Sequence, residues 1–398
     1  MVHPATEGRA VSARPRLVLA ACCAAHAVQD GLVTVVTTLL PILAQAFGLS
    51  YAQVGTIRAV HSIALSSFEI PSGLLSERTG SRILLVFGLL LAGVGYVWLS
   101  FAGGYWAVLF ALIVAGIGAG FQHTLASAMI TSAYPGAGRR TALGTYNAAG
   151  DIGKLAFAAA FAGLVGVGLA WPVVAGGIGL VTLGVGLAIW AMLRGAVETG
   201  RPARNADTPK QKGWGIRSRS GFSALCVVIF LDSLVQSGFL TFVAFLMIEK
   251  GVSTGVAAFA VVLTLVGGAA GKFACGLLAE RLGIVRTLVF AQVLTALGIV
   301  LVVFLPTFWA FALLPFLGVV LQGSTSPSYA TVGDLVEPDR QARGFALIYT
   351  LANGSAIAPV FLGLLADWNG VDAAMWAMIA VTLVSIPVCV PLARALRG

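Results

Sequence analysis

Long apolar runs alternate with short polar segments along almost the whole chain. Each run has roughly 20 residues or more, the length that an α-helix needs to cross about 30 Å of hydrocarbon. The pattern therefore predicts an all-α membrane protein. Twelve membrane-spanning helices are expected, at residues 17–46, 52–76, 83–101, 106–133, 141–166, 171–193, 221–248, 254–279, 284–305, 309–332, 344–366 and 373–393.

Composition supports a membrane location. Hydrophobic residues make up 59% of the 398, charged residues only 10%, and the mean hydropathy is +0.96, which excludes a soluble domain of this length. Glycines such as Gly116, Gly118 and Gly120 favour close helix packing over a phosphate loop, because no strand precedes them. The five cysteines have no metal-ligand spacing, so neither a metal nor a cofactor is expected.

The basic residues predict the orientation in the membrane. Of the 24 Lys and Arg, all except Arg58, Lys154, Lys250 and Lys272 fall at the chain ends, in alternate short connections or at 194–219. By the positive-inside rule both termini are predicted to be cytoplasmic, in a cell inner membrane. The net charge of +9 is then mostly an orientation signal, and no nucleic-acid partner is expected.

A comparison of the chain with itself reveals a repeat at an offset of 203 residues. The segment Gly73–Gly80 matches Gly276–Gly283 at six of eight positions, and Trp106 aligns with Trp309. Two six-helix bundles related by pseudo-symmetry are therefore predicted. The expected parts are a cytoplasmic tail (1–16), an N-terminal bundle (17–193), a basic cytoplasmic linker (194–220) and a C-terminal bundle (221–398).

The segment between the second and third spans resembles the signature of the major facilitator superfamily. The positions that carry the resemblance are Gly73, Glu77, Arg78, Gly80, Ser81 and Arg82, with Glu77 and Ser81 departing from the usual Asp and Arg. The resemblance implies a secondary transporter that works by alternating access. It also implies that Glu77 and Arg78, with Glu280 and Arg281 in the second half, clamp helix ends at the cytoplasmic side.

Within that superfamily, the first half is most similar to the fosmidomycin-resistance-like transporters. The similarity lies in His26-x-x-x-Asp30, Leu40-Pro41, residues 47–55 and Phe121-x-His123. It implies export by proton antiport. The fifth span departs from the glycine-rich exporter helix that ends in Gly-Pro, because it reads Gly-Asp-Ile-Gly-Lys over residues 150–154 without a proline. The direction of transport therefore stays open.

Seven charged residues lie inside predicted spans, where each costs ~2.5 to 3.5 kcal/mol on insertion scales. Such charges need a partner, a water-filled cavity or a function. Together they predict a polar route through the protein. They are Asp30, Arg58, Glu69, Asp151, Lys154, Asp232 and Lys272.

The second span carries a polar stripe. Arg58 and Glu69 are eleven residues apart, so they differ by about 20° around a helix, with Ser62 on the same face and His61 beside it. The forked guanidinium of Arg58 suits a carboxylate or phosphonate ligand. The alternative is a permanent ion pair with an acid such as Asp30.

Proton coupling is assigned to a histidine and carboxylate pair in the first span. His26 and Asp30 are one helical turn apart, and a carboxylate beside an imidazole in a partly dry cavity can exchange a proton. Asp232 is the approximate counterpart of Asp30 in the second half. A static hydrogen bond is the alternative for His26 and Asp232.

The remaining charges allow two interpretations each. Lys154 either contacts the solute, at the depth of His123, or pairs internally with Asp151 at i,i+3. Lys272 and Glu69 occupy equivalent positions in the two halves. They predict gate pairs that form and break during transport, with static helix-end pairing as the alternative.

The sequence thus predicts a proton-coupled secondary transporter of a small anionic solute, a carboxylate or phosphonate. Arg58, Lys154, His123, His61, Gln122 and Tyr349 are the expected solute-binding residues. Proton-antiport efflux of drugs or metabolites is the alternative, and a membrane receptor or an intramembrane enzyme is disfavoured. The expected partners are the solute, protons and the lipid bilayer, and the expected state is a monomer.

Overall fold

The computed structural model describes residues 14–134, 136, 138–194, 214–337 and 341–396, without the side chains of a few helical residues such as Glu77. The described residues form helices, apart from connections and one isolated bridge between Ile216 and Val336. The first half contains α1 (Pro15–Phe47), α2 (Tyr51–Thr79), α3 (Ser81–Leu99), α4 (Tyr105–Ala119), α5 (His123–Ala133), α6 (Gly138–Gly166) and α7 (Trp171–Met192).

The second half has more breaks within its helices. It contains α8 (Arg219–Glu249), α9 (Thr254–Ala257), α10 (Phe259–Leu282), α11 (Ile284–Phe304), α12 (Thr307–Gly323), α13 (Thr325–Ala330), α14 (Val332–Leu335), α15 (Gln341–Gly354), α16 (Ala358–Asn369) and α17 (Val371–Ala395). A short 3-10 turn, Ser355–Ile357, joins α15 to α16.

The predicted all-α fold with twelve spans is confirmed. In the part of the chain that the structure describes, eleven stretches are long and apolar enough to cross a membrane, and several combine two or three short helices. The twelfth span is α2, which has 29 residues but contains the polar stripe predicted from the sequence. The polar side chains of this stripe therefore make α2 less apolar than the other spans.

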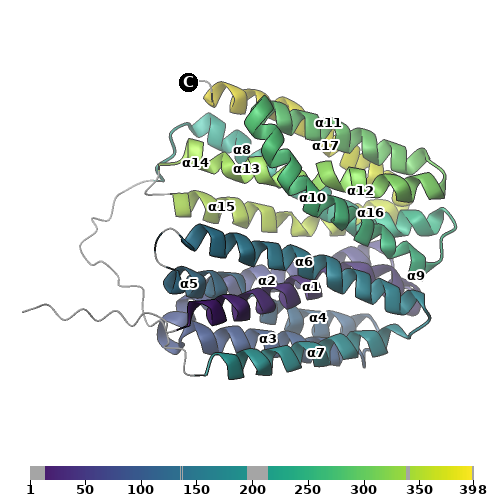
Figure 1. Cartoon of the computed structure of the whole chain (residues 1–398). Helices are drawn as coiled ribbons and strands as arrows, with labels where there is room; N and C mark the ends of the chain where they lie inside the picture. The colour runs from purple at the N-terminus through teal and green to yellow at the C-terminus, as the bar shows by residue number, and fades with distance from the viewer. Residues whose placement is uncertain (1–13, 135, 137, 195–213, 338–340, 397–398) are drawn as a thin grey trace, which may run out of the picture.

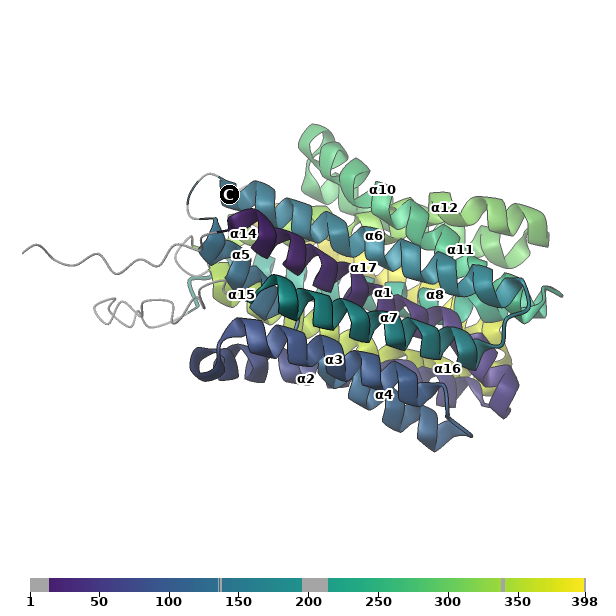
Figure 2. The ribbon, with the colours of Figure 1, turned by 60° about the horizontal axis from the view of Figure 1, so that its bottom comes forward.

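The helices of the first half gather on one side of the molecule and those of the second half on the other (Figure 1). After rotation, α3 and α4 lie at the bottom of the view and α10 and α12 at the top (Figure 2). Most of the expected linker, residues 195–213, lies outside the described residues, and the division of the chain at 194–220 stays a prediction.

Glycines allow α1 and α6 to pack closely. A Cβ atom on Gly150 would lie 2.6 Å from the imidazole ring of His26, and a Cβ on Gly153 would meet the backbone of Ala27. A Cβ on Gly116 would lie 2.6 Å from the carbonyl oxygen of His61. The packing role expected for the Gly116 cluster is therefore seen, and the α6 glycines bring the acid and base of that helix towards α1.

The two halves meet closely at the end of the bundle where α2 begins. The backbone amides of Tyr51 and Ala52 donate to the carboxylate of Asp367 at 2.7 and 3.0 Å, so an acid of α16 caps the N-terminus of α2. The hydroxyl of Tyr51 donates to Glu249 at 3.2 Å. Gly363 lies against the Tyr51 carbonyl with no room for a side chain. These contacts close α2 against α16 at this end.

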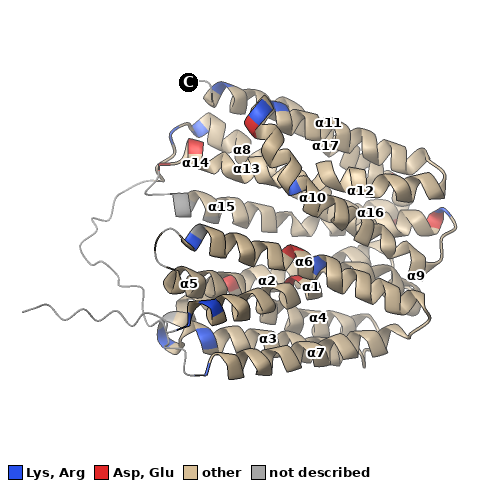
Figure 3. Cartoon of the chain, viewed as in Figure 1, with Lys and Arg blue, Asp and Glu red and all other residues tan. Residues whose placement is uncertain are grey.

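Most Lys and Arg residues lie at the opposite end, near the beginnings of α1, α3 and α8 and the ends of α10 and α17 (Figure 3). Further charged residues are visible partway along the bundle, on α1, α6 and α10 (Figure 3). The charge distribution thus has two parts, a basic end and a small group within the helices.

Candidate functional site

The carboxylate of Asp30 is the centre of the group within the helices. Its side chain is 8% exposed, and it lies 3.2 Å from Nε2 of His26 and 2.9 Å from Nζ of Lys154 through the same oxygen, Oδ2. Its other oxygen lies 3.6 Å from Nε2 of His123. Helices α1, α5 and α6 therefore bring together four residues that the sequence had assigned to the site.

The chain geometry explains why these residues meet. His26 and Asp30 are one turn apart on α1, and α6 approaches α1 through Gly150 and Gly153. The break between α4 and α5 makes His123 the first residue of α5. The imidazole rings of His26 and His123 consequently lie edge to face, with centroids 5.1 Å apart.

His26 is held in one orientation by Tyr146. Its Nδ1 lies 2.8 Å from the backbone carbonyl oxygen of Tyr146, and its ring stacks on the Tyr146 ring at 4.1 Å between centroids. A carbonyl oxygen only accepts hydrogen bonds, so Nδ1 must carry the proton. The Tyr146 hydroxyl in turn accepts from the Gln122 side chain at 2.6 Å. These contacts point Nε2 of His26 at Asp30.

The ionic group continues into the second half. Lys154 lies 3.4 Å from Oδ1 of Asp151, and the same oxygen lies 2.6 Å from Nζ of Lys272 on α10. Carboxylates and ammonium groups thus alternate from Asp30 through Lys154 and Asp151 to Lys272. We call these four residues, with His26 and His123, the ionic cluster. The side chains of Lys154, Asp151 and Lys272 are each about one third exposed, so solvent and a solute can reach them.

Arg58 stands apart from the ionic cluster. Its guanidinium donates to the hydroxyl of Ser62, which confirms the shared face on α2. Among the described residues no acidic group lies within ion-pair distance of Arg58, and Asp30 pairs with Lys154 instead. His61 is buried, and its Nδ1 has no hydrogen-bond partner among the described residues. The unpaired nitrogen of His61 can form a hydrogen bond with a ligand, and the guanidinium of Arg58 has four unused N–H donors that can bind one.

Asp232 has surroundings unlike those of Asp30. Its two oxygens accept hydrogen bonds from Ser324 at 2.8 Å, Gln236 at 2.8 Å and Gln292 at 3.1 Å. These donors are neutral and come from α8, α11 and the turn between α12 and α13, so they satisfy a buried carboxylate without a counter-charge. The environment corresponds to the static alternative considered from the sequence.

The remaining predicted gate residues are spread over the basic end. Glu69 is partly buried on α2, and its side chain forms no ion pair with any described residue. Arg78, Glu280 and Arg281 are exposed at helix ends, and the described residues offer them no ion pair. The side chain of Glu77 lies outside the described residues.

The predicted solute-binding tyrosine lies in an aromatic group of the second half. Tyr349 is 52% exposed on α15, and its ring lies 5.3 Å from Tyr329 and 6.4 Å from Phe345 between centroids. It is separate from the ionic cluster. Aromatic faces of this kind can stack on an apolar part of a solute.

Several contacts were not foreseen in the sequence. The Lys272 to Asp151 pair joins residues 121 positions apart, and the roles of Tyr146 and Asp367 depend on helices that meet only after folding. The position of Tyr146 could have been noticed in the sequence, because it lies one turn before Gly150, which packs against His26. No local pattern marks Asp367 as a cap for a helix more than 300 residues away.

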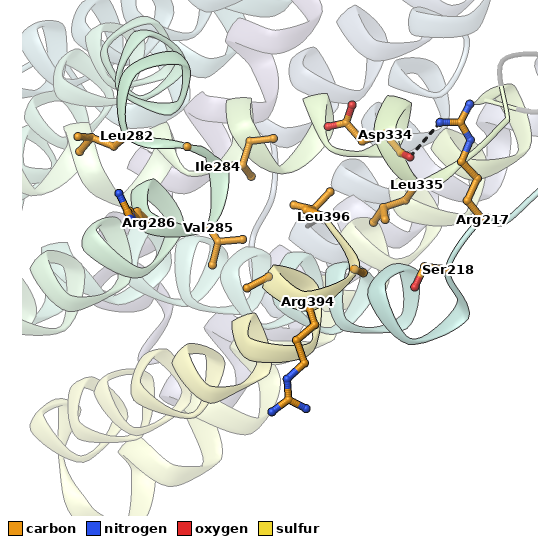
Figure 4. A pocket seen from close by; sticks show the side chains of 13 residues that line it. Arg217, Ser218, Leu282, Ile284, Val285, Arg286, Asp334, Leu335, Arg394 and Leu396 are labelled. Atoms are coloured by element: carbon orange, nitrogen blue, oxygen red, sulfur yellow. Dashed lines mark hydrogen bonds between the residues drawn. The ribbon is translucent and has the colours of Figure 1, made fainter. Parts of the chain in front are cut away.

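A cavity of about 1020 Å³ lies elsewhere, at the basic end of the second half. Arg217, Arg286 and Arg394 line it together with apolar side chains from the ends of α10, α14 and α17 and the start of α11. Figure 4 shows Arg217 reaching the Asp334 carbonyl, at 3.4 Å, while Arg394 points away from the other side chains. None of the predicted site residues lines this cavity, and its arginines do not converge on one point.

The family model described as Major Facilitator Superfamily matches residues 22–231 and 225–397. The fosmidomycin resistance protein of Escherichia coli strain K12 is 22% identical over 362 residues, covering 89% of this chain and 87% of that protein. The 3-(3-hydroxy-phenyl)propionate transporter of the same strain is 26% identical over 246 residues, covering 60% of this chain and 59% of that protein.

A solved structure shares the fold. The crystal structure of a bacterial homologue of the human lysosomal transporter Spinster, in an inward-facing and occupied conformation, superposes with a TM-score of 0.81. It covers 97% of this chain and 98% of the other, at 18% sequence identity. At this identity the likeness concerns the fold, and it extends over both halves of the chain.

Proposed function

Because the chain belongs to the Major Facilitator Superfamily, we propose that it moves a small anionic solute across the membrane in a process coupled to protons. Family and fold show that the chain is a multi-pass transporter of the inner membrane and not an enzyme. The solute class, the coupling ion, the residue roles and the monomeric state are parts of the proposal.

The proposed orientation has both termini in the cytoplasm. Its support is the gathering of Lys and Arg at the end of the bundle that holds the starts of α1 and α8 and the end of α17 (Figure 3). The end closed by Tyr51 and Asp367 then faces outward. With the halves divided at 194–220, the contacts of Asp367 with Tyr51 and Ala52 join the two halves at the outer end, so the described state is closed to the outside. Transport requires these contacts to break.

One observation carries the proposal for an anion. Arg58 is a cation within a membrane-spanning helix whose described partner is a neutral hydroxyl, so its charge lacks compensation. A carboxylate or phosphonate would supply the missing negative charge through paired hydrogen bonds. The relatives named for fosmidomycin and for 3-(3-hydroxy-phenyl)propionate make both anion types reasonable probes.

Lys154 is the second proposed contact. Its ammonium group already divides its hydrogen bonds between Asp30 and Asp151, at 2.9 and 3.4 Å. An anion entering beside it would compete with these carboxylates. The solute can therefore weaken the hold of Lys154 on Asp30, and this links solute binding to the protonation of that acid.

Asp30 is the proposed proton site. When the ring of His26 is neutral and its proton is on Nδ1, Nε2 directs a lone pair at Oδ2 of Asp30 over 3.2 Å. Two lone pairs repel at that distance, so a proton is favoured between them whenever Lys154 moves away. His123, with a side chain 40% exposed, offers a second nitrogen on the solvent side for exchanging that proton.

The Asp151 to Lys272 pair is the proposed inner contact between halves. It joins α6 to α10 at 2.6 Å and shares Asp151 with Lys154. A solute or proton that rearranges Lys154 therefore changes the charge that Lys272 faces. Glu69 on α2 occupies the position equivalent to that of Lys272, and we propose that it forms a gate pair in the opposite state of the transport cycle.

Proton-antiport efflux remains the second candidate, because the fosmidomycin resistance protein matches nearly the whole chain. Purified protein in liposomes with an imposed pH gradient separates the two. Accumulation of labelled 3-(3-hydroxyphenyl)propionate or fosmidomycin on the acidic side indicates antiport, and movement with the proton indicates symport. Flux that ignores the pH gradient contradicts proton coupling in both versions.

A further inference from the structure

We infer that His26, Asp30 and His123 form a binding site for a divalent transition-metal ion of the zinc class, in the middle of the membrane. The sequence did not predict a metal site, because the three residues lie on two helices without a recognisable ligand spacing. The inference concerns binding and is independent of proton coupling, so either can fail without the other.

The ligand atoms already have the spacing of a metal site. One nitrogen from each histidine and one carboxylate oxygen all lie within 4.8 Å of one another. Nε2 of His26 is 3.2 Å from one Asp30 oxygen, and Nε2 of His123 is 3.6 Å from the other. In a tetrahedral zinc site with bonds of about 2.0 to 2.1 Å, neighbouring ligand atoms are roughly 3.3 Å apart. Small side-chain rotations suffice to bind an ion.

The tautomer of His26 is the one that a metal ligand needs. Its Nδ1 donates to the Tyr146 carbonyl oxygen at 2.8 Å, so in the neutral ring the lone pair is on Nε2, which lies 3.2 Å from Oδ2 of Asp30. Metal-binding histidines typically donate their other ring N–H to a carbonyl or carboxylate in this manner. A ring stacked on Tyr146 and packed against Gly150 is also fixed in direction before any ion arrives.

Solvent can deliver the ion from the His123 side. The His123 side chain is 40% exposed, whereas those of His26 and Asp30 are 6% and 8% exposed. Three protein ligands leave a fourth position for water or for an oxygen of an anionic solute. The site is thus open on one side and enclosed on the other.

Lys154 is the built-in competitor. Its ammonium group lies 2.9 Å from Oδ2 of Asp30, and a divalent ion there would repel it. Lys154 has another acceptor, because Asp151 lies 3.4 Å away. The ion and Lys154 therefore compete for Asp30. Removing the lysine charge is expected to tighten ion binding, which a nonspecific surface site would not show.

The test uses full-length protein without a histidine tag, purified in detergent, with His3→Gln as the background. Co²⁺ is titrated while visible absorption is recorded, and Zn²⁺ is titrated by calorimetry. One ion per chain with tetrahedral Co²⁺ bands is expected. His123→Gln and Asp30→Asn are each expected to weaken binding at least 10-fold, and Lys154→Gln to strengthen it. His61→Gln, the matched histidine control on α2, should leave binding unchanged.

His123→Gln is the decisive variant, because its partly exposed side chain makes misfolding a poor explanation for lost binding. Absence of saturable binding at millimolar Co²⁺ or Zn²⁺ would overturn the inference. So would His123→Gln or Asp30→Asn binding like the parent, or a loss of affinity in His61→Gln equal to theirs. A Lys154→Gln variant that binds no more tightly would contradict the competition.

Discussion

Replacing Arg58 by Gln tests the proposed anion site. The change removes the positive charge and keeps an amide that can still donate to Ser62, the described partner of the guanidinium. Without a solute, we therefore expect the variant to express and unfold much like the wild type. With a bound carboxylate or phosphonate, the charge-assisted hydrogen bonds are lost.

The size of the effect follows from the missing bonds. A hydrogen bond between charged groups contributes about 1.5–3 kcal/mol, so a loss of about 2–3 kcal/mol weakens binding roughly 30- to 150-fold. A ligand at 100 times its Kd stabilises the folded protein by about 2.7 kcal/mol. At the same concentration, the variant would gain only about 0.3–0.9 kcal/mol.

The assay is thermal unfolding of purified protein with and without whichever probe stabilises the wild type, 3-(3-hydroxyphenyl)propionate or fosmidomycin. Arg16→Gln, at the exposed start of α1, is the matched control and should keep the full ligand-induced shift. A full shift in Arg58→Gln would refute the role of Arg58. An equal loss in Arg16→Gln would show that net charge, rather than this site, attracts the ligand.

Other contacts give three further predictions. Gly150→Ala places a methyl group 2.6 Å from an imidazole ring and is expected to destabilise the protein by about 1–3 kcal/mol in thermal unfolding; Gly144→Ala, where the space is open, should not. A double-mutant cycle of Asp151→Asn and Lys272→Met is expected to give a coupling of about 1 kcal/mol for this part-exposed pair, and additive effects would contradict it. Asp232→Asn turns an amide towards hydrogen-bond donors, so stability should fall while gradient-driven transport persists; the reverse result would make this acid a coupling site.

The sequence predicted well whatever depends on neighbours within one helix. The spans follow from apolar length, and the pairs His26 with Asp30 and Arg58 with Ser62 follow from i,i+4 spacing. The polar α2 was also predicted as a span, because apolar and small residues surround Arg58, His61 and Glu69 over the length of a membrane-spanning helix.

Contacts between helices could not be derived in the same way. For Lys154 the sequence predicted either a solute contact or a pair with Asp151, and the structure adds Asp30 because two glycines let α6 approach α1. Lys272 was related to Glu69 by the repeat, yet it binds Asp151. A repeat fixes equivalent positions within the halves, and it says nothing about which side chains meet across them.

The most direct test of the account is gradient-driven transport by Asp30→Asn. The amide keeps the size of the side chain but cannot be a carboxylate that alternates between a proton and Lys154. In liposomes with an imposed pH gradient, we expect the variant to lose solute accumulation while it still exchanges labelled for unlabelled solute. Accumulation equal to that of the wild type would contradict the assignment of proton coupling to Asp30.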